Sequence, residues 1–358
     1  MSNNNTNNDD NNNNPPPPAP PQAMRAWVYT STRGGIEKNL QLISDAPLPF
    51  HPPLPQDAIL VKVHYSTLNP ADYKFPELGP FMRALIPTPA SPGMDFSGVV
   101  AQVGHAITTS YRVGDKVFGR IAPPSKHGSL GEYVLAQPSG CAAVPSGVPL
   151  QDASTIGTAA QTAYQCIAPH VKPGDKVFVN GGSGGTGTFG IQIAKALGCH
   201  VTATCSGRNV ELCRSLGADE VIDYTAENVS EALKAKGQVY QLVVDNVGTP
   251  ADLHRAADQF LLPDGIFVQI GGEFTVSNFA TLLSRGFLPS FLGGGKRKWQ
   301  YLVTNNSHAD LEQIARWMSE GKVKAVIDEV FPYEDVPKAF EKLRTGRARG
   351  KIVIDCST

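Results

Sequence analysis

The stretch FVNGGSGGTGTFGIQIAKALG, residues 178–198, constrains the fold of this chain more than any other part of the sequence. An apolar strand pattern runs into a glycine-rich turn, and a helical pattern follows at once. Gly182, Gly184 and Gly187 match G-x-G-x-x-G in this strand–turn–helix context. The first glycine permits a tight turn, the second lets the backbone approach a pyrophosphate, and the third lets the helix pack closely on the strand.

The other residues of the turn, Ser183, Gly185 and Thr186, lead into the helix. A helix N-terminus offers free N–H groups and a partial positive charge to phosphates. Glycine-rich turns also occur for structural reasons alone. The strands and helices that alternate around this one favour a dinucleotide site.

The chain changes its pattern near residue 150. Before it, short strand-like segments such as 58–69 and 93–104 are separated by Pro and Gly, which is typical of a small antiparallel barrel or sandwich. After it, continuous apolar strands alternate with helical patterns, including an expected helix at 253–261. This alternation indicates a parallel sheet covered on both faces, so the fold class is α/β.

Composition argues against several classes of partner. Of 358 residues, 41% are hydrophobic and 18% are charged, which is enough for two domains with cores of their own. A formal net charge of −1 argues against binding to nucleic acid or to an anionic membrane. The six cysteines show no metal-ligand spacing, and residues 1–22 lack the features of a secretory signal. We therefore expect a cytoplasmic location.

The segment after the second strand of the alternating region indicates which nucleotide binds. An NAD site places Asp or Glu there, about 20 residues after the glycines, to bind the ribose hydroxyls. This chain has Ser206 and Arg208 instead, and no carboxylate before Glu211. A hydroxyl and a guanidinium suit a 2′-phosphate, which favours NADPH. The alternative is a helix-capping serine beside a solvated arginine.

Further segments, taken with the glycine-rich turn, resemble one protein family. GMDFSGVV, VGDKVFG, GEYV, LGADEVIDY and GKIVI are similar to the medium-chain dehydrogenase/reductase superfamily and, more closely, to its zinc-independent quinone oxidoreductase-like branch. The resemblance implies a GroES-like β-rich catalytic domain and a Rossmann doubly wound parallel-sheet domain. The expected boundaries are a disordered Asn/Pro-rich tail at 1–22, the catalytic domain at 23–147, the NADPH-binding domain at 148–305 and a C-terminal return to the catalytic domain at 306–358.

The same resemblance argues against a metal ion. Zinc alcohol dehydrogenases have a Cys near the place of Asn69 and a His–Glu pair where this chain has Met94 and Asp95. Methionine is a poor ligand for Zn²⁺. Without a Lewis acid, an activated C=C bond accepts hydride more easily than a carbonyl does, because the resulting enolate carries its charge on oxygen.

The resemblance also implies site residues. Asn69 and Tyr73 fall where this branch lines the substrate cleft, and Tyr73 is the candidate donor or acid, with a packing role as the alternative. Asp72 is expected in a surface pair with Lys74 or as a brace of the loop, and Asp95 is expected to hold backbone amides. The other residues expected at the cofactor are Thr162, Tyr224, Val247, Gly248, Gly271, Arg347 and Lys351.

Three hypotheses of function follow. The first is an NADPH-dependent reductase that transfers hydride to quinones or to the activated C=C bond of enones and enals, without a metal. The second is a trans-acting enoyl reductase of a polyketide or fatty-acyl pathway, which acts on enoyl thioesters. The third is a nucleotide-binding protein with a structural or interaction role. A homodimer through the predicted strand at 296–305 is left open, because its basic residues could instead keep that edge solvated.

Overall fold

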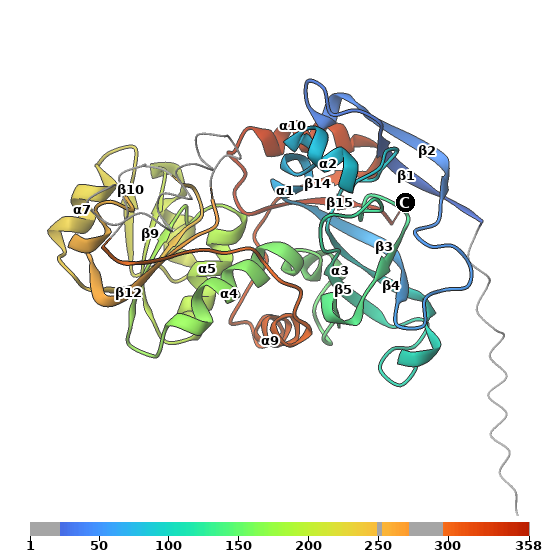
Figure 1. The fold of residues 1–358 in the computed structure, drawn as a ribbon. Coiled ribbons are helices and arrows are strands. Elements are labelled where there is room, and N and C mark those ends of the chain that lie inside the picture. Colours follow the sequence, from blue (N-terminus) through green and yellow to red (C-terminus); the bar gives the residue numbers. More distant parts are fainter. Residues whose placement is uncertain (1–21, 249–252, 272–295, 358) are drawn as a thin grey trace, which may run out of the picture.

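The computed structural model describes residues 22–248, 253–271 and 296–357 (Figure 1). The tail predicted for residues 1–22 lies outside these ranges except for its last residue. Figure 1 shows two units, each built on its own β-sheet, with the C-terminal segment crossing back to the first unit. Among the described residues, no helix is both long and apolar enough to cross a membrane.

The first unit is β-rich, as predicted. Its seven-stranded sheet has the order β14-β15-β3-β4-β5-β7, with β6 paired to β3, and only the β14–β15 pair is parallel. β1 and β2 form a separate antiparallel pair. The strands are β1 (Ala23–Tyr29), β2 (Leu40–Pro47), β3 (Ile59–Leu68), β4 (Asp95–Val103), β5 (Lys116–Arg120), β6 (Tyr133–Ala136), β7 (Cys141–Ala143), β14 (Ile327–Pro332) and β15 (Lys351–Asp355).

The second unit carries the parallel sheet that the alternating pattern predicts. Its order is β10-β9-β8-β11-β12-β13, and every pairing is parallel. The chain adds strands outward from β8 in one direction and from β11 in the other, so the strand order reverses between these two neighbours. The strands are β8 (Lys176–Asn180), β9 (His200–Cys205), β10 (Glu220–Asp223), β11 (Tyr240–Asp245), β12 (Leu261–Gln269) and β13 (Lys298–Tyr301).

Both faces of this sheet are covered, because successive side chains of a strand point to opposite faces. In β8, Val177 and Val179 join one core cluster and Phe178 joins another. The first cluster includes side chains of α4, α5 and α9, and the second includes those of α7. The helices are α1 (Ala71–Lys74), α2 (Pro80–Leu85), α3 (Leu150–Ala153), α4 (Gln161–Ile167), α5 (Gly185–Ala196), α6 (Val210–Ser215), α7 (Val229–Ala235), α9 (His308–Ser319) and α10 (Val336–Arg344).

The helix predicted at 253–261 is wrong for the described residues. They form turns and a short 3₁₀ segment at Ala257–Gln259, and β12 begins at Leu261. The apolar residues of this segment are buried, as in an amphipathic helix. The carbonyl of Phe260, however, accepts hydrogen bonds from the N–H groups of Val239 and Tyr240, so tertiary pairing with the entry of β11 overrides the helical pattern.

The C-terminal segment joins the two units at the glycine-rich turn. Gly350 N donates to Ser183 O at 3.0 Å, and Gly184 and Gly350 form an isolated parallel bridge. Immediately after this contact, β15 enters the sheet of the first unit beside β3. The predicted domain boundaries remain a prediction, but this contact brings the start of β15 directly against the turn.

Phe340 of α10 provides a test of how the C-terminal segment is held. Its ring is fully buried in a cluster with Trp27, Leu68 and Ile352. We expect Phe340→Ala to lower the free energy of unfolding by about 3–5 kcal/mol in urea denaturation. Glu341→Ala, on the exposed side of the same helix, should change it by less than about 0.5 kcal/mol. Equal losses would show that α10 is not held by this cluster.

Candidate active site

The glycine-rich turn differs from its predicted form at the first glycine. The left-handed residue is Gly181, with φ +79°, because the chain turns directly after β8 ends at Asn180. Gly182 serves close packing instead. A Cβ on it would lie 2.9 Å from Ala203 Cβ and 3.1 Å from Ile191 Cδ1. The predicted role of the first glycine therefore belongs to the residue before it.

The second and third glycines of the motif have contrasting surroundings. A Cβ on Gly187 would lie 2.0 Å from Gly181 O, so α5 packs against the turn in a way that only glycine permits. A Cβ on Gly184 would have Gly181 O as its nearest atom, at 3.7 Å. The protein itself leaves space over Gly184, which is the position where the motif predicts a phosphate. Gly184 is the N-cap of the twelve-residue helix α5, and no side chain caps this helix end in the described structure. The first N–H groups of a helix have no partner within the helix and can bind a phosphate.

A buried polar network holds the turn at the ends of the central strands. Thr204 Oγ1 accepts from Gly181 N at 2.8 Å and donates to Asn180 Oδ1 at 2.7 Å. Asn180 Nδ2 in turn donates to Asp245 Oδ1 at 2.8 Å. Three neighbouring strands, β9, β8 and β11, therefore fix the position of the turn through residues at or next to their C-terminal ends. This network was not predicted, because its members are far apart in sequence.

Asn209 is a second residue that sequence reasoning missed. Its Nδ2 donates to Ser183 Oγ at 3.1 Å and lies 3.4 Å from Ser206 Oγ. It therefore links the glycine-rich turn to the segment predicted to read the ribose. Its Oδ1 is buried, and no hydrogen-bond partner for it exists in the described part of the chain. In the sequence, Asn209 directly follows Arg208, and this position was the signal that could have identified it as a site residue. Arg208 itself is exposed.

The remaining predicted cofactor residues of the parallel sheet lie just after its strands. Asp245 Oδ1 accepts from Val247 N at 3.1 Å and from Gly248 N at 2.9 Å. Gly271 lies against the same segment, since a Cβ on it would be 2.2 Å from Asn246 O. Tyr224 and Val247 are 57% and 44% exposed, which leaves them accessible to a ligand. These residues lie at the C-terminal ends of the parallel strands, the edge at which open α/β sheets bind ligands.

Thr162 and Arg347 have different surroundings. Thr162 is buried in α4, and its hydroxyl hydrogen-bonds that of Thr304. Arg347 is exposed, and its backbone N–H donates to Thr345 Oγ1 at 3.2 Å. Their contacts with a cofactor remain predictions.

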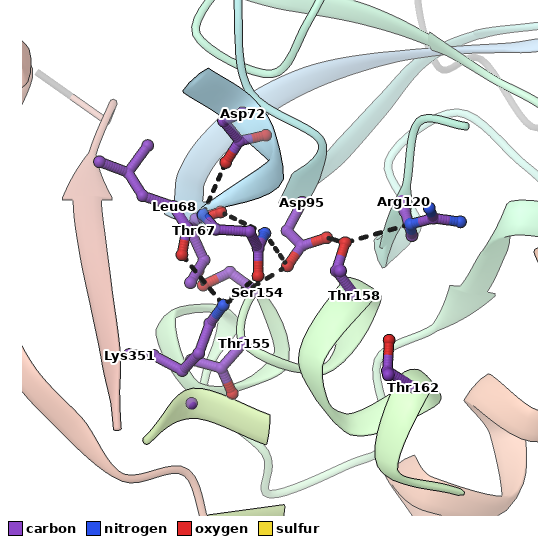
Figure 2. Close-up of polar contacts among 12 residues, drawn as sticks. Thr67, Leu68, Asp72, Asp95, Arg120, Ser154, Thr155, Thr158, Thr162 and Lys351 are labelled. Carbon is purple, nitrogen blue, oxygen red and sulfur yellow. Dashed lines mark hydrogen bonds and ion pairs between the residues drawn. The ribbon is translucent and has the colours of Figure 1, made fainter. Parts of the chain in front are cut away.

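Lys351 lies at the junction of the two units (Figure 2). It is 3% exposed, and its Nζ donates to Leu68 O at 3.0 Å and to Asn69 Oδ1 at 2.5 Å. The same ammonium is 3.9 Å from Asp95 Oδ2, and burial lowers its pKa. A Cβ on Gly185 would lie 3.0 Å from Lys351 Cδ. The aliphatic part of the lysine therefore packs on the glycine-rich turn, while its ammonium binds residues of the first unit.

Asp95 is held by side chains, which corrects the expectation that it holds backbone amides. It is fully buried and accepts from Asn69 Nδ2 at 2.9 Å and from Thr158 Oγ1 at 2.6 Å. Arg120 Nε donates to the same Thr158 oxygen at 3.1 Å. Both polar atoms of the Asn69 side-chain amide are therefore engaged, Nδ2 with Asp95 and Oδ1 with Lys351. This favours a positioning role for Asn69 over direct contact with substrate.

Asp72 is buried, which corrects its expected place in a surface pair. It is 4% exposed, and its Oδ2 accepts from Asn69 N at 2.6 Å, so it does brace the loop. Burial, together with the smaller effect of the Asp95 charge, raises the pKa of its carboxyl to about 7. The hydrogen bond from Asn69 N and the charges of Lys351 and Arg120 oppose this shift.

Tyr73 points to a different environment. Its ring lies under the guanidinium of Arg344, 4.2 Å from ring centroid to Cζ, and it packs against the core cluster that includes Phe340. This contact agrees with the alternative of a packing tyrosine. A catalytic role for Tyr73 remains a prediction.

A pocket lies beside α1. Asp72, Phe75, Met94 and Ile121 contribute to its wall. Met94, the residue that stands where zinc dehydrogenases have a histidine, is buried here. Within the described residues, no group of three or more His, Cys, Asp or Glu is placed to hold a metal ion.

The chain matches two protein families and has several similar relatives. Residues 55–146 match the alcohol dehydrogenase GroES-like domain, and residues 216–354 match the family described as zinc-binding dehydrogenase. The trans-enoyl reductase pgmF of Aspergillus terreus is 46% identical over 346 residues, which cover 93% of this chain and 96% of that protein. The chloroplastic NADPH-dependent alkenal/one oxidoreductase of Arabidopsis thaliana is 33% identical over 344 residues, 93% of this chain and 80% of that protein.

Among solved structures, the quinone oxidoreductase from Coxiella burnetii is similar to this chain with a TM-score of 0.79 and 29% identity. The match covers 93% of this chain and 99% of that one. The similarity therefore extends over both units and not over the nucleotide-binding unit alone.

Gly184 and Gly187 provide a matched pair of substitutions. We expect Gly187→Ala to lower the free energy of unfolding by about 1–3 kcal/mol, because its Cβ has no space beside Gly181 O. Gly184→Ala should cost less than about 1 kcal/mol, the difference between Gly and Ala at an N-cap. It should nevertheless weaken NADPH binding, because its methyl group enters the space predicted for a phosphate. Chemical denaturation and NADPH fluorescence titration measure the two effects. Equal destabilisation by both variants would contradict this description of the turn.

Proposed function

The chain belongs to the medium-chain dehydrogenase/reductase superfamily and to its quinone oxidoreductase-like branch, and we propose that it uses NADPH to reduce the C=C bond of an α,β-unsaturated thioester or ketone without a metal ion. The observation that carries the proposal is the contact of the glycine-rich turn with the buried Asn69–Asp95–Lys351 cluster. It brings a dinucleotide site next to a substrate unit whose polar groups are organised without metal ligands.

The residues present fit a dinucleotide. The open space over Gly184 and the N-terminus of α5 lie at the turn that would hold its phosphates. Asn209 is hydrogen-bonded to Ser183 of this turn, and its buried Oδ1 has no partner in the described structure. For the phosphorylated form, the support is Ser206 and the exposed Arg208. The nearby carboxylate of Asp223 is engaged by Thr225 N and Oγ1, at 2.9 and 2.6 Å, in its own turn.

Bound NADPH supplies a hydride for the β-carbon of the substrate. The chain then has to hold the two reactants together, exclude water and stabilise the electron pair that moves onto the carbonyl oxygen. The hydrogen bond between Lys351 and Asn69 ties the start of α1 to the cofactor unit. The buried carboxylate of Asp95 compensates the positive charges of Lys351 and Arg120. An enolate needs donors and a proton source, not a Lewis acid, so this arrangement suits C=C reduction.

The enoyl thioester is the preferred substrate class in this proposal. The support is the 46% identity to a protein named trans-enoyl reductase over nearly the whole of both chains. Free enones, enals and quinones are the second candidate, which the Arabidopsis and Coxiella relatives favour. We further propose a homodimer through β13, the last strand of the six-stranded sheet, and a cytoplasmic location as the sequence predicts.

A substrate panel tests this proposal. NADPH oxidation should be rapid with crotonyl-N-acetylcysteamine, slower with an enone or a quinone, and absent with a saturated aldehyde, because only the first three offer a conjugated acceptor. Activity should survive exhaustive treatment with a chelator. A rate with the quinone above that with the thioester would favour the second candidate. Turnover of none of them would leave the hypothesis of a non-catalytic nucleotide-binding protein.

Arg208 tests the choice of cofactor. We expect Arg208→Ala to weaken NADPH binding by about 10- to 100-fold, the worth of a hydrogen-bonded charge pair, and to leave NADH binding nearly unchanged. Arg214→Ala is the matched control, because Arg214 is also exposed on the same segment but pairs with Glu211 at 2.8 Å. It should change neither affinity. Equal losses of NADPH and NADH affinity in Arg208→Ala would remove the assignment of this residue.

A further inference from the structure

The pocket beside α1 contains two buried polar atoms that have nothing to bind in the described structure. They are Oδ1 of Asp72 and Oγ of Ser91, and both residues line the pocket. The rest of its wall is largely apolar, with Phe75, Ile86 and Ile121 among the lining residues. Buried polar atoms are nearly always satisfied in folded proteins. Two unpartnered ones in the same apolar pocket would be satisfied by a ligand that brings polar groups into it.

The two oxygens of Asp72 have different surroundings (Figure 2). Oδ2 accepts the hydrogen bond from Asn69 N at 2.6 Å, whereas Oδ1 points away from that N–H. The chain links this carboxyl to the cofactor unit in two steps. Asn69, which binds Asp72 through its backbone, binds Lys351 through its side chain, and Lys351 packs on Gly185 of the glycine-rich turn. The carboxyl is therefore held in a fixed orientation at the border of both units.

We propose that this pocket holds the unsaturated acyl group of the substrate and that Asp72, through Oδ1, donates the proton that completes the reduction. The inference rests on the proposed function. With NADPH bound, hydride transfer would oxidise the dihydronicotinamide and form a C–H bond at the β-carbon, and the C=C electron pair would shift to give an enolate with its charge on the carbonyl oxygen. The O–H bond of Asp72 then breaks as the α-carbon takes the proton and the enolate returns to a carbonyl. Solvent reprotonates Asp72, so one hydride and one proton are consumed in each cycle.

The electrostatic surroundings support this role. A neutral carboxyl is required, and burial together with the charge of Asp95 keeps the pKa of Asp72 at about 7. The carboxylate formed after proton transfer is stabilised by Asn69 N, Lys351 and Arg120. Tyr29, which also lines the pocket, stays neutral because burial raises its pKa to about 12. A general acid is most effective when its pKa lies near the working pH.

The sign of the pH dependence follows directly. The acid form of Asp72 predominates below pH 7, so the rate of the proton-transfer step should be constant there. Above pH 7 the rate should fall, by about tenfold for each unit. A residue that only braced the loop would give the opposite trend, because the hydrogen bond from Asn69 N is stronger to a carboxylate than to a neutral acid.

Asp72→Asn tests the proposal. The amide oxygen can still accept from Asn69 N, but the amide cannot donate a proton to carbon. We expect kcat with crotonyl-N-acetylcysteamine to fall by about 100-fold, with NADPH affinity unchanged and with the decline above pH 7 abolished. Asp115→Asn is the control. Asp115 Oδ2 accepts from Arg112 N at 2.8 Å in the same three-residue geometry, outside the pocket. This control should keep the kcat and the pH profile of the parent protein.

Two measurements do not depend on turnover. Infrared difference spectra of the parent protein should show a protonated carboxyl band that disappears as pH rises through 7 and that is absent in Asp72→Asn. The saturated product, butyryl-N-acetylcysteamine, should shift this band when it binds, and Ser91→Ala should weaken that binding severalfold. The pH titration of the band and its shift on product binding need only the parent protein, so these two results remain decisive if Asp72→Asn does not fold.

The outcomes separate the two proposals. A parent protein that reduces none of the C=C substrates overturns the proposed function and this inference with it. An active parent protein whose Asp72→Asn variant keeps its rate and pH profile overturns only the role of Asp72 as the acid. A carboxyl band that product leaves unchanged overturns the assignment of the pocket.

Discussion

The structure depends on one buried ammonium. Lys351 brings a positive charge into the interior between the two units, where an isolated charge would be very unfavourable. Leu68 O, Asn69 Oδ1 and Asp95 compensate it, and these partners come from β3, the segment after it and β4. Because the lysine stem also packs on Gly185, the same residue fixes the distance between the nucleotide turn and the substrate unit.

A second network does the same for the turn itself. Thr204, Asn180 and Asp245 connect the ends of three parallel strands, and the last of them also holds the N–H groups of Val247 and Gly248. Networks of this kind tolerate little change, since a partly satisfied buried group costs more than an apolar replacement. The turn is thus positioned by the sheet, and the lysine then positions the first unit relative to the turn.

This arrangement gives a physical reason for C=C reduction in preference to alcohol oxidation. The positions at which zinc dehydrogenases have cysteine and histidine hold Asn69 and Met94, and the adjacent acid, Asp95, is fully used by neighbouring side chains. The groups left unpartnered among the described residues of this region are a carboxyl oxygen and a hydroxyl in an apolar pocket. Such groups can receive a carbonyl compound and supply a proton.

Local sequence patterns determined the parallel sheet, the glycine-rich turn and the β-rich first unit. Strands, helices and tight turns are each indicated by the spacing and type of neighbouring residues, so a local pattern is enough to predict them. Only the tertiary structure decided which glycine reverses the chain, why residues 253–261 do not form a helix, and where Asp72 and Asp95 lie. Asp72 was expected at the surface beside Lys74 or as a brace of the loop. The charges that act on its carboxyl include that of Lys351 in β15, which is about 280 positions away along the chain. Burial and charge are set by the packing of distant segments, and no local pattern contains that information.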